Sequence, residues 1–249
     1  IASGVIGEVL SVDFAWFLNT GHGADYFRRW HRRRENSGSL LVHKSTHHFD
    51  LVNWWLDDSP EEVFCHASHR FYTPETAKAR GLGAHGERCL DCPVSGDCPF
   101  YLDLSSKEGL RKLYLENEAE DGYFRDRCVF AEEIDIWDNM SLSVSYAGGT
   151  LLNYMLHTFS PWEGYRISLH GTKGQIDHKC VETTYVSGDD SVPGELVPGE
   201  TTITLLPEFS EPQQIEVRTG EGGHGGGDPV LLADIFDPEA PSDPLRRKA

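Results

Sequence analysis

The sequence predicts an α+β fold in which strands outnumber helices and pair into a largely antiparallel sheet. Two observations carry this prediction. From Ala131 onward the chain consists mainly of short β-like runs separated by turn residues. Few segments have the length and apolar pattern of a helix. With 249 residues and 39% hydrophobic content, the chain is long enough to bury a core.

The first strand is expected at 7–18, where β-branched and aromatic residues are frequent. A β-hairpin is expected at 139–157, because two apolar runs flank the turn residues Ala147, Gly148 and Gly149. The acidic stretch rich in proline and glycine that ends at Gly199 reads as a surface loop. Further strands are expected at 62–71, 165–170, 175–179, 182–186, 201–206 and 213–218.

Helices are expected at 37–56, at 107–119 and at 229–236. The first of them has Asn36 or Ser37 as its N-cap. Residues 74–128 are polar, irregular and cysteine-bearing, and we interpret them as an insertion.

The formal charge of −18 argues against non-specific binding to nucleic acids or anionic membranes, because phosphate repels such a surface. No apolar run approaches the ~20 residues that span a bilayer, and no signal-peptide pattern is visible, so a cytoplasmic protein is expected. The chain opens on Ile1 rather than methionine and closes in a linker-like run, so we expect a piece of a longer protein.

One local exception to the acidic balance is 27–34, which holds five arginines among its last seven residues. Such a cluster either pairs with the surrounding carboxylates or contacts an anion, because guanidinium groups recognise carboxylates and phosphates with a forked geometry. In the second case, Arg29 and Trp30 are candidates for substrate contact.

The segment 38–55 raises the question of function, because it places three histidines, a lysine and an aspartate in an otherwise apolar run. On a helix, His43, His47 and Asp50 fall within roughly 60° of one another, and Lys44 and His48 form a neighbouring strip. Most of the other positions are leucine, valine, phenylalanine or tryptophan, which predicts a buried helix with one polar stripe. These histidines are either satisfied core residues or one wall of a functional cleft. We favour the cleft, because several titratable groups converge there.

Two chemistries are possible for this stripe. Metal ligation is disfavoured, because zinc-binding helices of this spacing carry a glutamate after the first histidine, and here that position is Lys44. General acid–base chemistry fits better. A histidine titrates near neutral pH, and a nearby lysine can lower its pKa and polarise a hydroxyl or carbonyl group.

The cysteines suggest a second site within the insertion. Cys89, Cys92 and Cys98 follow a C-x2-C-x5-C spacing, and Cys128 is available later. We favour a four-cysteine structural zinc site, with free thiols or a disulfide and an iron–sulfur cluster as alternatives. The remaining cysteines, at 65 and 180, lie in strand-like runs and are expected in the core.

The run 220–225 matches G-x-G-x-x-G, but the match is weak. A dinucleotide fingerprint needs a following strand that ends in an acidic residue, and the proline-rich segment after Phe236 cannot form a central strand. We interpret the glycines as a close backbone approach, with Asp228 capping the last helix. His224 lies in this turn and is a candidate for substrate contact.

Taken in order, these segments resemble the C-terminal domain of the Gfo/Idh/MocA family, which includes glucose–fructose oxidoreductase and inositol dehydrogenase. The family's helix signature typically reads Gly-Gly-x-Leu-x-Asp-x-Gly-x-His-x-x-Asp. Residues 38–50 read Gly-Ser-Leu-Leu-Val-His-Lys-Ser-Thr-His-His-Phe-Asp. Residues 6–9, 163–174 and 225–228 resemble the family's entry strand, a strand with its tight turn, and the start of a late helix. The resemblance spans nearly the whole chain, whereas the cysteine insertion resembles only a subset of members.

The resemblance implies an open, mostly antiparallel sheet with helices on one face and the other face used for dimer contact, hence a homo-oligomer. It implies an NAD- or NADP-dependent oxidoreductase acting on a sugar, polyol or inositol-like hydroxyl group. His47 falls on the family's catalytic histidine, which handles the hydroxyl proton. His43 falls where many members have an aspartate, a departure that shifts part of the role to Lys44, the expected cofactor contact. Asp50 and His48 are the remaining expected substrate contacts.

The family's N-terminal Rossmann domain is missing from this sequence, so the chain alone is expected to bind the cofactor weakly and to be inactive. Two other functions stay open. One is a non-catalytic module for sugar binding or dimerisation. The other is a glycosidase that uses transient NAD-dependent oxidation, a chemistry known within the same superfamily.

Overall fold

The computed structural model describes residues 1–182, 200–217 and 226–237. The chain divides into two compact units, Ile1–Gln214 and Ile215–Ala249. The second unit contains the helix α8 (Gly227–Phe236), whose apolar side chains, Phe236 among them, are exposed. In the described part of the chain, no helix is long and apolar enough to cross a membrane.

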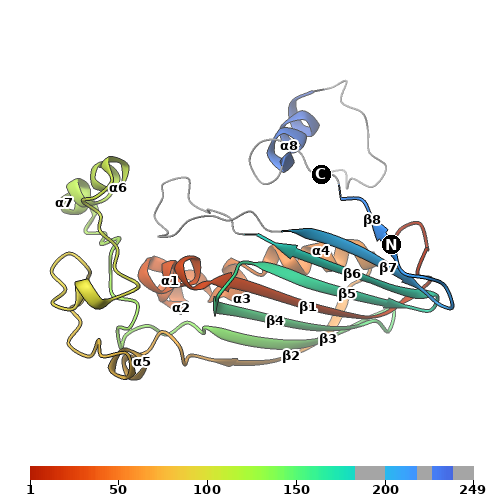
Figure 1. The fold of residues 1–249 in the computed structure, drawn as a ribbon, viewed down its shortest axis with the longest axis horizontal. Coiled ribbons are helices and arrows are strands. Elements are labelled where there is room, and N and C mark those ends of the chain that lie inside the picture. Colours follow the sequence, from red (N-terminus) through yellow and green to blue (C-terminus); the bar gives the residue numbers. More distant parts are fainter. Residues whose placement is uncertain (183–199, 218–225, 238–249) are drawn as a thin grey trace. The chain divides into compact units, whose positions relative to one another are not determined.

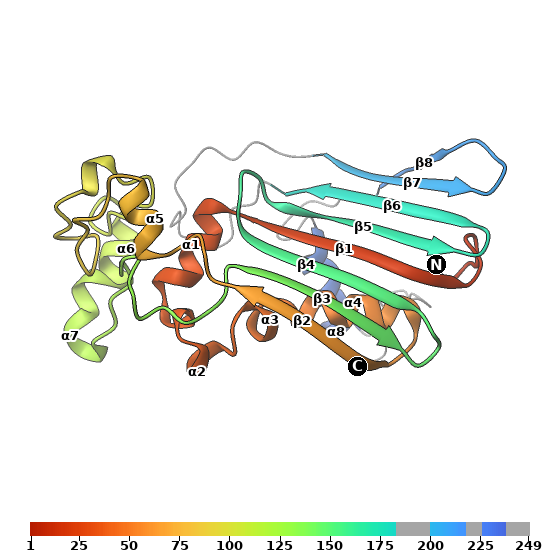
Figure 2. The same ribbon diagram turned by 90° about the horizontal axis from the view of Figure 1, so that it is seen from below.

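The first unit is built on one open sheet (Figure 1). Figure 2 shows its strands side by side in the order β2-β3-β4-β1-β5-β6-β7-β8. Strand β1 pairs parallel with β4, while β1–β5, β2–β3, β3–β4, β5–β6 and β6–β7 are antiparallel. The strands are β1 (Val9–Asn19), β2 (Pro60–Ser68), β3 (Asn139–Tyr146), β4 (Leu151–Ser160), β5 (Gly164–Gly171), β6 (Gly174–Val181), β7 (Thr201–Pro207) and β8 (Gln213–Ile215). The predicted α+β class is confirmed.

Alternation along the central strands gives the sheet one buried face. In β4, Leu152, Tyr154 and Leu156 are at most 1% exposed, and the residues between them are exposed or half-buried. Because successive side chains point to opposite faces of a strand, this pattern places the core on one side of the sheet. The helices α3 (Leu40–His43) and α4 (Thr46–Leu56) lie over that side, where Phe49 of α4 contacts Tyr154.

A helix that the sequence did not predict, α1 (Thr20–Arg28), follows β1 directly. Its N-cap is Asn19, whose side chain accepts a hydrogen bond from the backbone N–H of His22 at 2.9 Å. Glycine is unfavourable inside a helix, but a Cβ atom on Gly23 would lie 1.7 Å from the carbonyl oxygen of Thr158. The glycine therefore permits the close packing of α1 on β4.

The predicted continuous helix over 37–56 is wrong. The short helix α2 (Arg34–Ser37) ends at Gly38, and Lys44 and Ser45 interrupt the helix between α3 and α4. The backbone N–H of Ser45 bonds to the carbonyl of Leu40 at 2.8 Å, one residue further back than in an α-helix. The helix predicted over 107–119 is also divided, into α6 (Glu108–Leu113) and α7 (Glu118–Asp121) with a 3₁₀ turn between them.

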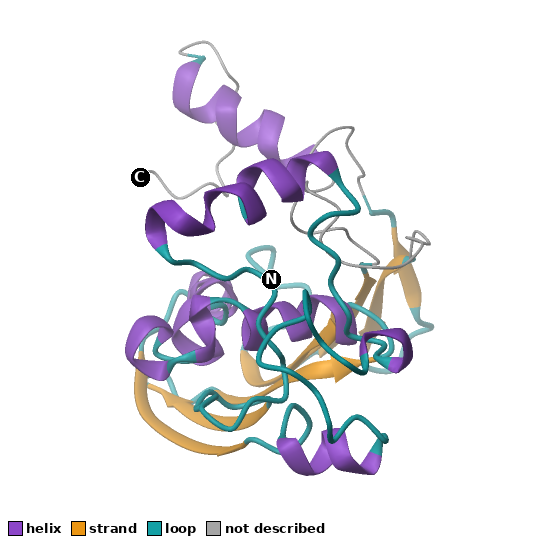
Figure 3. Ribbon diagram, turned by 90° about the vertical axis from the view of Figure 1, so that its left-hand side faces the viewer, coloured by secondary structure: helices purple, strands orange, loops and turns teal. Residues whose placement is uncertain are grey.

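The insertion lies beyond one end of the sheet (Figures 1 and 2), and Figure 3 looks onto that end. It has a small core of its own, formed by Cys89, Leu102, Leu104 and Leu110. The remaining short helices are α5 (Pro74–Ala79) and the 3₁₀ turns Trp30–Arg32, Ser95–Asp97 and Leu115–Asn117.

Candidate active site

The interruption between α3 and α4 places Lys44 at the end of one helix, and one residue, Ser45, separates it from the next. Its ammonium nitrogen lies 5.4 Å from the ring centre of Trp16 on β1. Burial lowers the pKa of Lys44, and the carboxylates of Glu163 and Glu182 oppose this shift. Lys44 is therefore a partly desolvated cation within the electrostatic range of two acids.

His48 fixes the first turn of α4 to the sheet. Its ring stacks on Trp16 at 4.0 Å between centres, and its Nδ1 lies 2.7 Å from the hydroxyl of Tyr154. The same hydroxyl lies 2.9 Å from Oγ of Ser45. His48 is only 2% exposed, and burial, followed by the charges of Lys44 and His47, lowers its pKa to about 3. The structure thus buries this predicted substrate contact against Trp16 and Tyr154 of the sheet.

We expect the free energy of unfolding to fall as the pH drops below about 6.5. The ordinary histidine pKa is 6.5, whereas those of buried His48 and His31 are each about 3. Between these values the unfolded chain binds protons that the folded chain does not, which destabilises the fold by up to about 1.4 kcal/mol per pH unit and histidine. Urea unfolding of the complete protein at pH 7.5 and 5.5 measures the slope, which His48→Gln should reduce and the exposed-site variant His66→Gln should not. An unchanged slope in His48→Gln would contradict this assignment.

His43 and His47 are exposed. Burial, then the charges of Arg29, Lys44 and His47, lowers the pKa of His43. The structure therefore brings His43, Lys44 and His47 within electrostatic range of one another. Trp30 meets the ring of His43 edge-on at 5.4 Å, so the arginine-rich segment borders the same group.

Asp50 is exposed on α4 three residues after His47, and the described residues give it no hydrogen bond or ion pair with this group. His224 falls outside the described residues.

The prediction missed a buried acid–histidine pair beside Lys44. Glu163, at the start of β5, is 2% exposed, and its Oε1 lies 2.6 Å from Nδ1 of His22 on α1. Its Oε2 accepts hydrogen bonds from the backbone and side chain of Asn19. Because 141 residues separate the two partners, no local pattern could reveal the pair. The single available signal was an unexplained glutamate at the entry to a strand.

The segment before the site carries backbone strain. Ser39 has φ 70° and ψ 178°, a conformation that is essentially restricted to glycine. It is fully buried, and in the described structure its hydroxyl has no hydrogen-bond partner. The family signature has a glycine here, so this departure imposes a cost of order 1–3 kcal/mol.

The structure does not support the predicted zinc site. Cys89, Cys92, Cys98 and Cys128 line one small pocket together with His85. However, the ranges 1–182, 200–217 and 226–237 contain no group of three or more histidine, cysteine or acidic side chains that could hold a metal ion. All six cysteines are free thiols. The cysteine at 180 is buried as expected, but the one at 65 is exposed, because it lies on the edge strand β2.

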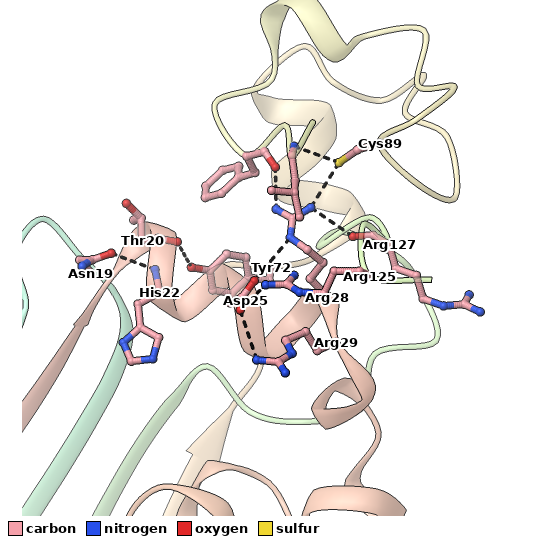
Figure 4. A network of polar contacts seen from close by, with 12 residues as sticks. Asn19, Thr20, His22, Asp25, Arg28, Arg29, Tyr72, Cys89, Arg125 and Arg127 are labelled. Carbon is pink, nitrogen blue, oxygen red and sulfur yellow. Dashed lines mark hydrogen bonds and ion pairs between the residues drawn. The ribbon is translucent and has the colours of Figure 1, made fainter. Parts of the chain in front are cut away.

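A network of arginines surrounds Asp25 on the insertion side of α1 (Figure 4). The Asp25 carboxylate lies 2.8 Å from Arg125, 3.7 Å from Arg29 and 4.0 Å from Arg28. Arg28 also donates to the sulfur of Cys89 at 3.2 Å and to the carbonyl of Phe100 at 2.6 Å. The network fastens α1 to the insertion.

Comparison with known families now identifies the chain. Residues 1–237 match the model of the Gfo/Idh/MocA family described as "Oxidoreductase family, C-terminal alpha/beta domain". The chain belongs to this family. The YteT protein of Bacillus subtilis (strain 168), a candidate oxidoreductase, is 43% identical over 254 residues. The match covers 99% of the present chain and 57% of YteT, so the chain spans little more than half the length of this curated relative.

Solved structures agree on the fold of this Gfo/Idh/MocA domain. Levoglucosan dehydrogenase, in complex with NADH and L-sorbose, matches with a TM-score of 0.54 at 13% identity, over 94% of this chain and 50% of that one. A candidate NADPH-dependent oxidoreductase from Desulfitobacterium hafniense DCB-2 matches with a TM-score of 0.51 at 13% identity, over 94% and 49%.

Proposed function

We propose that the chain is the substrate-side domain of an NAD- or NADP-dependent oxidoreductase that acts on a hydroxyl group of a sugar, polyol or inositol-like compound. The observation that carries this proposal is that Lys44, held over Trp16 at the α3–α4 break, and the exposed His47 both lie within electrostatic range of the buried anchor His48. The NADH and sugar present with levoglucosan dehydrogenase support the substrate class.

The described residues fit the reacting end of the cofactor rather than its phosphates. Dinucleotide phosphates bind at a parallel sheet with a glycine-rich loop, whereas the pairs determined in this sheet are antiparallel apart from β1–β4. When bound, the nicotinamide accepts or supplies the hydride. Lys44 and His47 are the residues that would face it.

Residues of this chain transfer the proton. The imidazole of His47 takes the proton from the substrate hydroxyl, or returns it in the reverse direction. The ammonium of Lys44 donates a hydrogen bond to the same oxygen and stabilises the negative charge that develops there. The buried carboxylate of Glu163 favours the charged form of Lys44, and His43 lies within electrostatic range of both Lys44 and His47.

The test is turnover by the complete protein, followed through the near-ultraviolet absorbance of the reduced nicotinamide, with NAD and NADP over a panel of sugars, polyols and inositols. We expect one substrate class to reduce the cofactor. Sugar binding without turnover would instead indicate a non-catalytic module. Release of a sugar from a glycoside without net consumption of NAD would indicate the glycosidase.

A further inference from the structure

A second cavity lies on a different side of α1 from the candidate active site. Its volume is about 210 Å³, and its lining includes Thr20, Asp25 and Arg28 of α1, with Arg80, Phe100 and Tyr101 from the insertion. One water needs only about 10–15 Å³, whereas drug-sized ligands occupy about 300–1,000 Å³. The cavity therefore suits a small molecule.

The α1 residues that line this cavity differ from those near the catalytic group. At 100° per residue, Thr20, Ala24 and Arg28 share one side of the helix. His22 and Tyr26, which contact Glu163 and the ring of His43, lie on another side. A ligand in the cavity would thus bind apart from Lys44 and His47.

The wall of the cavity carries an excess of positive charge. Its lining holds two guanidinium groups, Arg28 and Arg80, against one carboxylate, Asp25. Behind the lining, Arg29 and Arg125 also lie 3.7 and 2.8 Å from the Asp25 carboxylate. Arg125 is fully buried, and its Nε and Nη1 have no hydrogen-bond partner in the described structure. Buried cations are costly unless they are paired, so this cluster, visible in Figure 4, favours an additional anion.

Arg80 offers the donors for such an anion. It is exposed, and its guanidinium lies 5.2 Å from the ring of Phe71 and 5.7 Å from that of Phe100. Within the described ranges it forms no ion pair. The two rings orient the guanidinium by cation–π contact while its N–H groups stay available for forked recognition of an oxyanion.

We propose that this cavity binds a small molecule bearing a carboxylate or phosphate group. The guanidinium of Arg80 donates a pair of hydrogen bonds to the oxyanion, and Arg28 in the cavity wall adds a favourable positive charge. The rings of Phe100 and Tyr101 contact the rest of the ligand. Its site is separate from the position at which the substrate hydroxyl reacts.

The test is calorimetric titration of the complete protein without cofactor, using glucuronate, inorganic phosphate and glucose as probes. We expect glucuronate or phosphate to bind, with glucose at least tenfold weaker. Arg80→Gln should weaken the binding of the anion at least tenfold, whereas Lys78→Gln, which removes an exposed charge from the preceding helix α5, should change it less than twofold.

Binding of glucuronate alone would identify the ligand as a sugar acid, and binding of phosphate alone would identify a phosphorylated compound. Failure of both anions to bind, or equal binding by wild type and Arg80→Gln, would overturn the proposal. Because no turnover is measured, this outcome is independent of the oxidoreductase assignment.

Discussion

Replacing His47 with glutamine in the complete protein should lower kcat by about 10²–10⁴-fold, the usual contribution of a positioned general acid or base. Glutamine keeps a polar side chain of similar reach but cannot take up the substrate proton. His47 is exposed and has no anchoring role like that of His48, so the fold should be unaffected. Steady-state kinetics with the substrate identified in the panel measures the effect.

The control is His66→Gln, which changes an exposed histidine on the edge strand β2 and should leave kcat within twofold. The affinity of the His47→Gln variant for the cofactor, measured by fluorescence titration, should match that of wild type. A variant that retains full kcat would remove His47 from the mechanism. Loss of cofactor binding together with turnover would assign it to binding instead.

The strands were predictable because their signal is local. The strand at 139–146 was expected within the same bounds as β3, since its alternation of apolar and polar residues matches the two faces of a half-buried strand. By contrast, α1 was missed. Its two glycines weaken the helical signal. Gly23 is required because the backbone of a strand more than a hundred residues later packs directly against it.

The candidate site was predictable in composition but not in arrangement. The residues of 43–48 read as part of one helix, because apolar residues flank them on both sides, at 40–42 and at 49, 51 and 52. Tertiary contacts interrupt the helix. Ser45 and His48 both turn toward Tyr154 of β4, and the strained Ser39 changes the direction of the chain before them. Consequently the polar residues do not form one buried stripe. His48 is buried, whereas His43 and His47 are exposed.

The same limit applies to the arginine-rich segment. Of the two sequence interpretations, pairing with acids is observed for some of these arginines, and contact with an anion remains a proposal. Arg32 pairs with Glu133 at 2.7 Å and Arg28 shares Asp25, so pairing accounts for part of the cluster. The balance of charge around Asp25 depends on Arg125, which comes from the far end of the insertion, and no pattern within 27–34 could indicate it.

The ion pairs around Asp25 should contribute strongly to stability. Asp25→Asn should destabilise the complete protein by about 3–5 kcal/mol, because it leaves Arg125 buried without a carboxylate and weakens the hold on Arg28 and Arg29. Thermal unfolding should show a decrease in Tm of roughly 6–20 °C. The matched control is Asp13→Asn, whose carboxylate is 57% exposed beside His170 and should contribute within about 0.5 kcal/mol.

A double variant separates the lost ion pair from other effects. If the penalty arises from an unpaired buried cation, then Arg125→Met in the Asp25→Asn background should recover at least about 1 kcal/mol, since the two side chains are in contact and their effects are not additive. Two results would show that the ion pairs of Asp25 do not stabilise the junction between α1 and the insertion. One is additive losses of stability in the double variant, and the other is an Asp25→Asn variant as stable as Asp13→Asn. Asp25 and Arg28 both line the second cavity. Either result would therefore also weaken the proposal that the positive charge of this cavity binds an anion.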